Sequence, residues 1–147
     1  MSTSATKRPR RPRVAKALAD LAADVPSTAT DLTGYSVRLF EYLCAHPQVL
    51  RLTTWAQLER PLPTPAEIET YRPKVAAIAA AQESGDITAI IDPVDLLAFT
   101  ISTATAWANA STALRSLSPE PSDSQARIKK HREAVANVER SIVSSAH

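Results

Sequence analysis

Glycine is the residue that most constrains this chain, because 147 residues contain only two, Gly34 and Gly85. Average usage is about 7%. Hairpin turns, phosphate-binding loops and dinucleotide-binding loops need glycine where the backbone turns sharply or approaches a phosphate. Aromatic residues make up 5% of the chain, whereas alanine is plentiful and β-branched runs are short. The composition therefore predicts an all-α protein and excludes those loop classes.

Cysteine and histidine are too few for a disulfide scaffold or a zinc site. The lone Cys44 lies between Leu43 and Ala45, and we interpret it as a half-buried core residue rather than a nucleophile. No apolar signal segment is evident, and the longest uncharged stretch, residues 96–114, is too polar to face lipid. We therefore expect a cytoplasmic protein with no membrane association, no metal and no cofactor.

Positive charge is concentrated in the first part of the chain. Residues 1–16 carry six basic side chains and no acidic one, whereas the whole chain has a net charge of +2. This charge and two prolines predict a disordered basic arm over residues 1–13. The arm is either a solvated tail without a partner or a weak contact for nucleic-acid phosphates. The candidate phosphate contacts are Arg8, Arg10, Arg11 and Arg13.

Hydrophobic spacing predicts five or six helices. A short helix and a linker occupy residues 14–29, and a helical domain occupies residues 30–147. Capping and stop signals place the helices of that domain over residues 31–46, 47–59, 64–85, 92–112 and 122–143.

The predicted helix over residues 64–85 has the clearest end signals. Thr64 and Glu67 form a capping box, and Gly85 is a C-terminal stop. Pro73 lies inside this helix and removes one backbone hydrogen bond. We therefore expect a kink or a split near Tyr71.

The last two predicted helices carry the pattern of a self-associating pair. The helix over residues 92–112 is apolar on two faces, although a small domain needs only one buried face. The first face comprises Leu96, Phe99, Thr103, Trp107 and Ala110, and the second comprises Leu97, Ile101, Ala104, Ala108 and Ser111. The last helix has a narrow seam, with charged residues such as Glu139 outside it. The seam comprises Ile128, His131, Val135, Val138 and Ile142.

Some of these residues allow two interpretations. His131 is either a packing histidine or a pH-sensitive or ligand-binding group. The aromatic side chains either form the core or line an apolar cavity between helices. No acid–base pair or nucleophile motif emerges from the sequence. We therefore predict a binding or assembly protein rather than an enzyme.

Three runs of sequence resemble the C-terminal regulatory domain of TetR-type transcriptional regulators. They are YSVRLFEYLCAHPQVLRLTTWAQLERP over residues 35–61, YRPKVAAIAAAQESGDI over 71–87 and IDPVDLLAFTISTATAWANAS over 91–111. In them a helix ending in AHP precedes an apolar helix with a tryptophan, and a DP-DLLA start leads into a helix of small residues. The resemblance implies an orthogonal and antiparallel bundle of five to six helices. It also implies a small apolar effector in a central cavity, and a homodimer formed by the last two helices of each subunit.

The resemblance assigns roles by position. The candidate effector-binding residues are Tyr42, Trp55, Tyr71, Phe99 and Trp107. The candidate dimer-interface residues are Leu97, Ile101, Ala104, Ala108, Ile128, His131, Val135 and Val138.

DNA reading is the point at which the chain departs from the family. Family members begin with a helix-turn-helix domain of about fifty residues that reads the major groove, whereas residues 1–33 contain no glycine and no aromatic residue. We expect that module to be missing or replaced by the basic arm. DNA contact then needs a helix-turn-helix supplied elsewhere, or is weak and made by the arm. The alternative function is a small helical protein that associates non-specifically with nucleic acid through its arm.

Overall fold

The computed structural model describes residues 10–59 and 62–144, and side chains from Arg13 onward within these ranges. The described residues form seven α-helices and no strand, which confirms the all-α prediction. The helices are α1 (Arg10–Asp24), α2 (Leu32–Ala45), α3 (Pro47–Glu59), α4 (Pro65–Glu83), α5 (Pro93–Asn109), α6 (Thr112–Arg115) and α7 (Gln125–Val143). A 3-10 turn over Ala29–Asp31 precedes α2.

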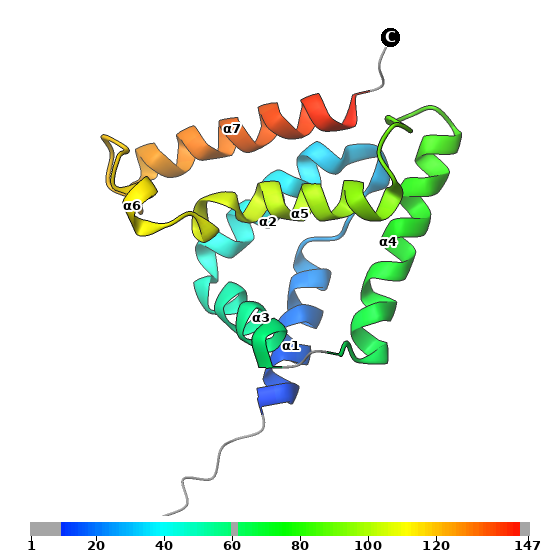
Figure 1. Ribbon diagram of the computed structural model, residues 1–147, viewed down its shortest axis with the longest axis horizontal. Coiled ribbons are helices and arrows are strands. Elements are labelled where there is room, and N and C mark those ends of the chain that lie inside the picture. The colour runs from blue at the N-terminus through cyan, green and yellow to red at the C-terminus, as the bar shows by residue number, and fades with distance from the viewer. Residues whose placement is uncertain (1–9, 60–61, 145–147) are drawn as a thin grey trace, which may run out of the picture.

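The helix α2 is the centre of the packing. It packs against both α5 and α7, which run antiparallel, while α1 packs against α3 and α4 packs against α5 (Figure 1). In Figure 1, α1 and α4 run steeply across the direction of α5 and α7. The core contains Leu96 of α5, Val135 of α7 and Ile78 of α4, whose side chains are almost completely inaccessible to solvent. The arrangement confirms the orthogonal and antiparallel bundle.

Side-chain caps fix the starts of α2 and α4, and a glycine follows the end of α4. The Asp31 carboxylate accepts a hydrogen bond from the Gly34 backbone N–H at 2.9 Å. The capping box of α4 has both of its bonds, because Thr64 Oγ1 accepts from the Glu67 N–H and the Glu67 carboxylate accepts from the Thr64 N–H. Gly85 follows α4 with φ +80°, a conformation that other residues adopt at a cost.

Several predicted boundaries need correction. One helix, α4, runs through Pro73, so the expected split near Tyr71 does not occur. Helix α1 begins at Arg10 instead of Val14, because a proline at position 12 is tolerated in the first turn. The exposed Cys44 is not a half-buried core residue.

The predicted helix over residues 92–112 is divided in two. Helix α5 ends at Asn109 because Ala110 is extended, with ψ 144°. The Ser111 hydroxyl then accepts from the Leu114 N–H at 3.1 Å and starts α6 at Thr112. The cap formed by Ser111 therefore ended the helix earlier than the hydrophobic spacing of residues 92–112 predicts.

The buried stripe of α5 lies between the two faces expected from the sequence. Leu96 and Leu97 are both buried, and Thr100 and Thr105 lie beside them in the interior. The Thr100 hydroxyl lies 2.9 Å from the Leu96 carbonyl oxygen, and the Thr105 hydroxyl donates to Ile101 O at 3.0 Å. Because these bonds return to the helix backbone, both threonines can enter the core at small cost.

An acidic residue of α7 is also buried. Glu139 is 0% exposed, and its Oε1 is hydrogen-bonded to Thr100 Oγ1. The Ser36 hydroxyl of α2 donates to the Thr100 carbonyl oxygen at 3.2 Å, so polar groups from three helices meet there. Burial raises the pKa of the Glu139 carboxyl, because water no longer stabilises its charge. Placing this residue outside the apolar seam was wrong.

The loop between α4 and α5 is held by Gln82. Its side-chain amide donates to Thr88 O at 3.0 Å and to Ile91 O at 2.7 Å. The Thr88 backbone N–H donates in turn to Val143 O at the end of α7, at 3.0 Å. The end of α4, the segment before α5 and the end of α7 are thereby joined.

Candidate functional site

A cavity lies among α1, α2, α3, α4 and α5. This inner cavity has a volume of about 290 Å³. Leucines dominate its lining on α1 and α2, and hydroxyl and amide side chains are frequent on α3, α4 and α5. The lining includes Leu18, Leu21, Tyr35, Leu39, Leu43, Thr53, Gln57, Thr70, Tyr71, Lys74, Ile101 and Thr105.

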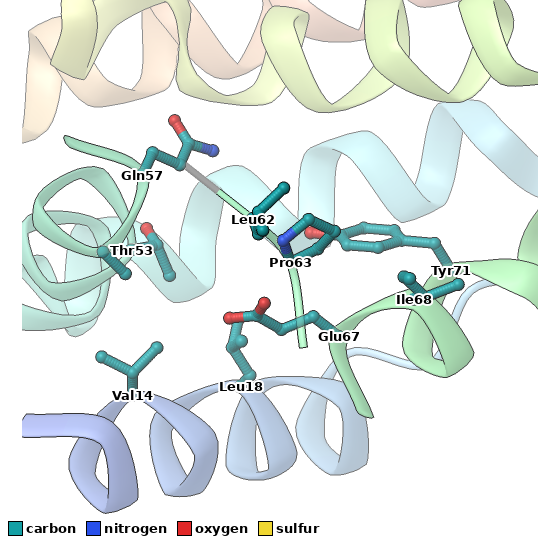
Figure 2. Close-up of a pocket in the computed structure, with 10 residues that line it drawn as sticks. Val14, Leu18, Thr53, Gln57, Leu62, Pro63, Glu67, Ile68 and Tyr71 are labelled. Carbon is teal, nitrogen blue, oxygen red and sulfur yellow. The ribbon is translucent and has the colours of Figure 1, made fainter. Parts of the chain in front are cut away.

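An outer cavity of about 400 Å³ adjoins the inner one. Leu18, Thr53, Gln57 and Tyr71 line both cavities. Figure 2 shows side chains of α1, α3 and α4 converging on the outer cavity together with those of the segment before α4. The shared residues place the two cavities side by side among α1, α3 and α4.

Among the described side chains that line the inner cavity, Lys74 is the only charged one. Its Nζ lies 3.4 Å from Tyr35 Oη and 5.5 Å and 5.8 Å from the ring centroids of Tyr35 and Tyr71. Among the described residues, no carboxylate oxygen lies within 4.0 Å of Lys74 Nζ. Burial lowers the pKa of Lys74, because the ammonium group has lost part of its hydration.

Three threonines of the inner cavity use their hydroxyl hydrogens within their own helices. Thr53, Thr70 and Thr105 each donate to a backbone carbonyl oxygen three or four residues earlier, at 3.0 Å in each case. They therefore present methyl groups and oxygen lone pairs to the cavity. The ammonium of Lys74 remains the strongest hydrogen-bond donor among the described lining groups.

The effector-binding residues predicted from the sequence do not gather at this cavity. Tyr71 lines it, whereas Tyr42 lies outside and stacks on His46 with ring centroids 4.1 Å apart. Trp55 is half-buried on α3 and lines neither cavity. Phe99 is 52% exposed on α5.

The remaining candidate, Trp107, belongs to a cluster of tilted rings near the C-terminal end of α5. Its ring lies 5.5 Å from the His131 ring, which lies 5.0 Å from the Phe40 ring. The Arg127 guanidinium lies 4.0 Å from the Trp107 ring centroid. Burial, and then the charge of Arg127, lower the pKa of His131. These contacts favour a packing role for His131.

Sequence reasoning missed Lys74, and it named Tyr35 only among the aromatic residues that either form the core or line a cavity. Tyr35 lies on the apolar face of α2, where it is indistinguishable from a core residue. Lys74 follows Tyr71 by three residues, so both side chains lie on one side of α4. That spacing was the available sequence signal for Lys74 in the cavity. It was overlooked because lysine side chains are ordinarily expected at the solvent-exposed surface.

The predicted dimer-interface residues differ in exposure. Because α2 packs against both α5 and α7, their apolar seams are largely covered by the chain itself. The buried members are Leu97, Ala104 and Val135; the half-buried ones are Ile101, Ile128 and His131; the exposed ones are Ala108 and Val138.

A different face of α5 and α7 is exposed and apolar. Phe99 of α5 immediately precedes Thr100, and Val138 of α7 immediately precedes Glu139, so both residues lie near the contact between the two helices. Phe99 is 52% exposed and Val138 is 48% exposed. Further small exposed residues on the two helices are Ala98, Ser102, Ala106 and Ala134.

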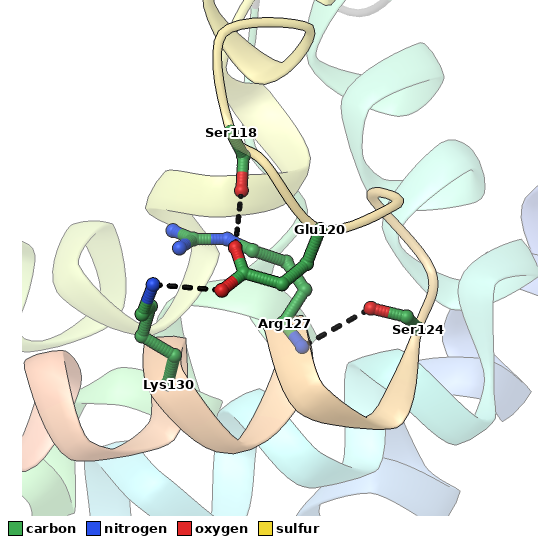
Figure 3. A network of polar contacts seen from close by, with 5 residues as sticks. All are labelled: Ser118, Glu120, Ser124, Arg127 and Lys130. Carbon is green, nitrogen blue, oxygen red and sulfur yellow. Dashed lines mark hydrogen bonds and ion pairs between the residues drawn. The ribbon is translucent and has the colours of Figure 1, made fainter.

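Polar contacts anchor the loop between α6 and α7. Glu120 accepts hydrogen bonds from Lys130 Nζ at 2.8 Å and from the Ser118 hydroxyl at 2.9 Å (Figure 3). The bonds from Lys130 and Ser118 lower the pKa of Glu120 to about 2. The Ser124 hydroxyl accepts from the Arg127 N–H at 3.2 Å and begins α7.

The candidate phosphate contacts lie at the edge of the described residues. Arg13 is exposed in the first turn of α1. Arg8 and most of the predicted basic arm lie outside the described residues, as do the side chains of Arg10 and Arg11. The phosphate contact therefore stays a prediction.

Residues 10–59 and 62–144 contain neither a candidate membrane-spanning helix nor a metal-ligand cluster. None of the helices there has the length and hydrophobicity that crossing a membrane requires. That part of the chain also contains no group of three His, Cys, Asp or Glu side chains placed to hold a metal ion.

The fold matches that of SCO4942 from Streptomyces coelicolor, a protein assigned as a transcriptional regulator. The TM-score is 0.77 and the identity 26%, over 91% of this chain and 72% of that chain. The fold is therefore that of a helical transcriptional regulator.

The family follows from the sequence itself. The family described as "Tetracyclin repressor-like, C-terminal domain" matches residues 31–140, and the chain belongs to it. The HTH-type transcriptional repressor SCO4008 of Streptomyces coelicolor is 42% identical over 97 residues, which are 63% of this chain and 50% of that protein. The match thus spans about half the length of this relative.

Proposed function

We propose that the chain is the effector-binding and dimerisation domain of a tetracycline repressor-like transcriptional regulator. One observation carries the proposal: α5 contributes to two surfaces at once. It supplies Ile101 and Thr105 to the inner cavity and Phe99 to the exposed apolar face. A ligand in the cavity therefore contacts the same rigid helix that a second subunit would contact.

The proposed partners are a small, largely apolar effector and a second copy of the chain. Pockets that bind small molecules combine an apolar lining with a few polar groups, as the inner cavity does. SCO4008 is named as an HTH-type repressor. We propose that this domain serves the same kind of regulator, in which a helix-turn-helix reads DNA.

Ligand binding tests the proposal directly. N-phenyl-1-naphthylamine, a neutral dye that fluoresces in apolar cavities, is titrated into the protein. We expect a saturable rise in fluorescence. Ala22 lines the inner cavity, so Ala22→Phe should fill part of it and weaken binding by about tenfold.

A matched substitution on the same helix serves as the control. Ala19 is exposed on α1 and lines neither cavity, so Ala19→Phe should leave the affinity within about twofold. No saturable binding, or equal affinity in the two variants, would overturn the assignment of the cavity.

A further inference from the structure

We infer that the inner cavity takes an anionic effector, a small apolar molecule with one carboxylate that binds Lys74. The inference rests on the proposed function, because it names the ligand class of the same cavity. The charge carried by the cavity lining, and not the match to the family, is the basis of the inference.

The first support is the incomplete pairing of the Lys74 ammonium. This group has three donors, and Tyr35 Oη lies within reach of one of them, at 3.4 Å. The two neighbouring tyrosine rings offer only the negative faces of their π systems. A half-buried ammonium with no carboxylate within 4.0 Å among the described residues is unfavourable. A ligand carboxylate would supply both the opposite charge and further acceptors.

The second support is the position of the acidic residue that lies two helical turns before Lys74, on the same side of α4. Glu67 lies seven residues before Lys74, lines the outer cavity and accepts the Thr64 N–H at 2.7 Å in the capping box. It is not a described lining residue of the inner cavity. The described lining there carries one positive charge and no negative one, so its electrostatic potential favours an anion.

The third support is the character of the remaining lining. Leu18, Leu21 and Leu39 offer apolar surface on α1 and α2. Thr53, Thr70 and Thr105 have used their hydroxyl hydrogens within their own helices. The other polar groups of the described lining are neutral hydroxyls and amides, so Lys74 is the one cationic partner there for an acidic group. The lining therefore fits an apolar body with a single acidic group at one end.

A matched pair of ligands tests the inference. 1-Naphthaleneacetate and 1-naphthaleneacetamide share size and shape but differ in charge. Isothermal titration calorimetry at neutral pH should give a dissociation constant about tenfold lower for the carboxylate. In Lys74→Met this preference should fall to about one, and Lys74→Arg should largely keep it.

Lys129→Met is the control, because it removes the same charge from an exposed site on α7. It should leave the preference unchanged. Circular dichroism of each variant checks that the helices are retained. If Lys74→Met does not fold, the ratio in the wild type and in Lys74→Arg decides the matter.

The other outcomes separate this inference from the proposed function. Equal affinity for the two ligands, or a preference that survives Lys74→Met, overturns the role of Lys74 and leaves the cavity assignment standing. Binding of the neutral dye without binding of either naphthalene ligand has the same meaning. If neither the dye nor the ligands bind, both proposals fall.

Discussion

Glu139 of α7 and Thr100 of α5 lie with their side-chain oxygens 2.5 Å apart inside the protein. Thr100 Oγ1 also lies 2.9 Å from Leu96 O. A hydroxyl has one hydrogen, so a protonated Glu139 satisfies both contacts: it donates to Thr100, which donates to Leu96. Burial raises the pKa of Glu139 and favours the same protonation state. A neutral carboxyl group therefore helps to join α5 to α7.

Glu139→Gln should remove a pH dependence of stability. Because the pKa of Glu139 is raised by folding, its stabilising contribution is complete below the unfolded pKa of about 4.3 and is lost as the pH rises through the folded pKa. We expect the variant to match the parent near about pH 4 and to exceed it by about 1 kcal/mol near about pH 8. Urea unfolding followed by circular dichroism measures this difference. The exposed Glu133→Gln should keep the pH profile of the parent, and parallel profiles for Glu139→Gln would show that Glu139 is ionised when folded.

Val138→Glu should dissociate the proposed dimer. The substitution places a carboxylate on the exposed face of α5 and α7, where a second subunit would desolvate it. We expect a dimer dissociation constant at least about a hundredfold higher. Light scattering after size-exclusion chromatography gives the molar mass over a range of concentrations. Ile90 is 80% exposed in the loop before α5, so Ile90→Glu should leave the mass unchanged. A Val138→Glu protein with the parental mass would place the interface elsewhere.

The preference for an anionic ligand should disappear as the pH rises. The carboxylate of 1-naphthaleneacetate stays ionised above about pH 6, whereas Lys74 loses its proton at a lower pH than an ordinary lysine. Affinity for the carboxylate should therefore fall toward that for the amide before exposed lysines titrate. Calorimetry at several pH values measures the ratio. In Lys74→Arg the preference should persist to higher pH, because guanidinium does not titrate in this range.

Gly85→Ala should destabilise the fold by about 1 kcal/mol. Gly85 has φ +80° and open space around its Cα, so the cost arises from backbone conformation and not from a clash. Thermal unfolding should show a decrease of about 3 °C in Tm. Asparagine tolerates this conformation better than alanine, so Gly85→Asn should lie between the two. Equal Tm values for the alanine variant and the parent would contradict this account.

The helix ends were predictable because their signals are local. The hydroxyl of Thr64, the carboxylate of Glu67 and the freedom of Gly85 act within four residues of the sequence, and the structure has all of them. The all-α class was predictable for a related reason, because two glycines leave few sites for tight turns.

The interior contacts were less predictable, because they depend on which helix covers which face. The buried positions of Thr100 and Glu139 follow from hydrogen bonds that a hydropathy pattern ignores. The packing of α2 on α5 and α7 covers Leu97, which the pattern alone made a candidate for a dimer interface. The cavity likewise brings Lys74 to Tyr35, 39 residues away in sequence, a pairing that no local spacing encodes.

The Gln82 side chain couples the movements of α4, α5 and α7, because its hydrogen bonds, together with that of Thr88, connect the ends of these three helices. Its amide holds two carbonyl oxygens of the segment that leads into α5, and Thr88 in that segment holds the end of α7. The helix that carries Lys74 and Tyr71 therefore cannot tilt without pulling on that segment. A displacement of α4 that enlarges the cavity is therefore transmitted to the start of α5 and to the end of α7.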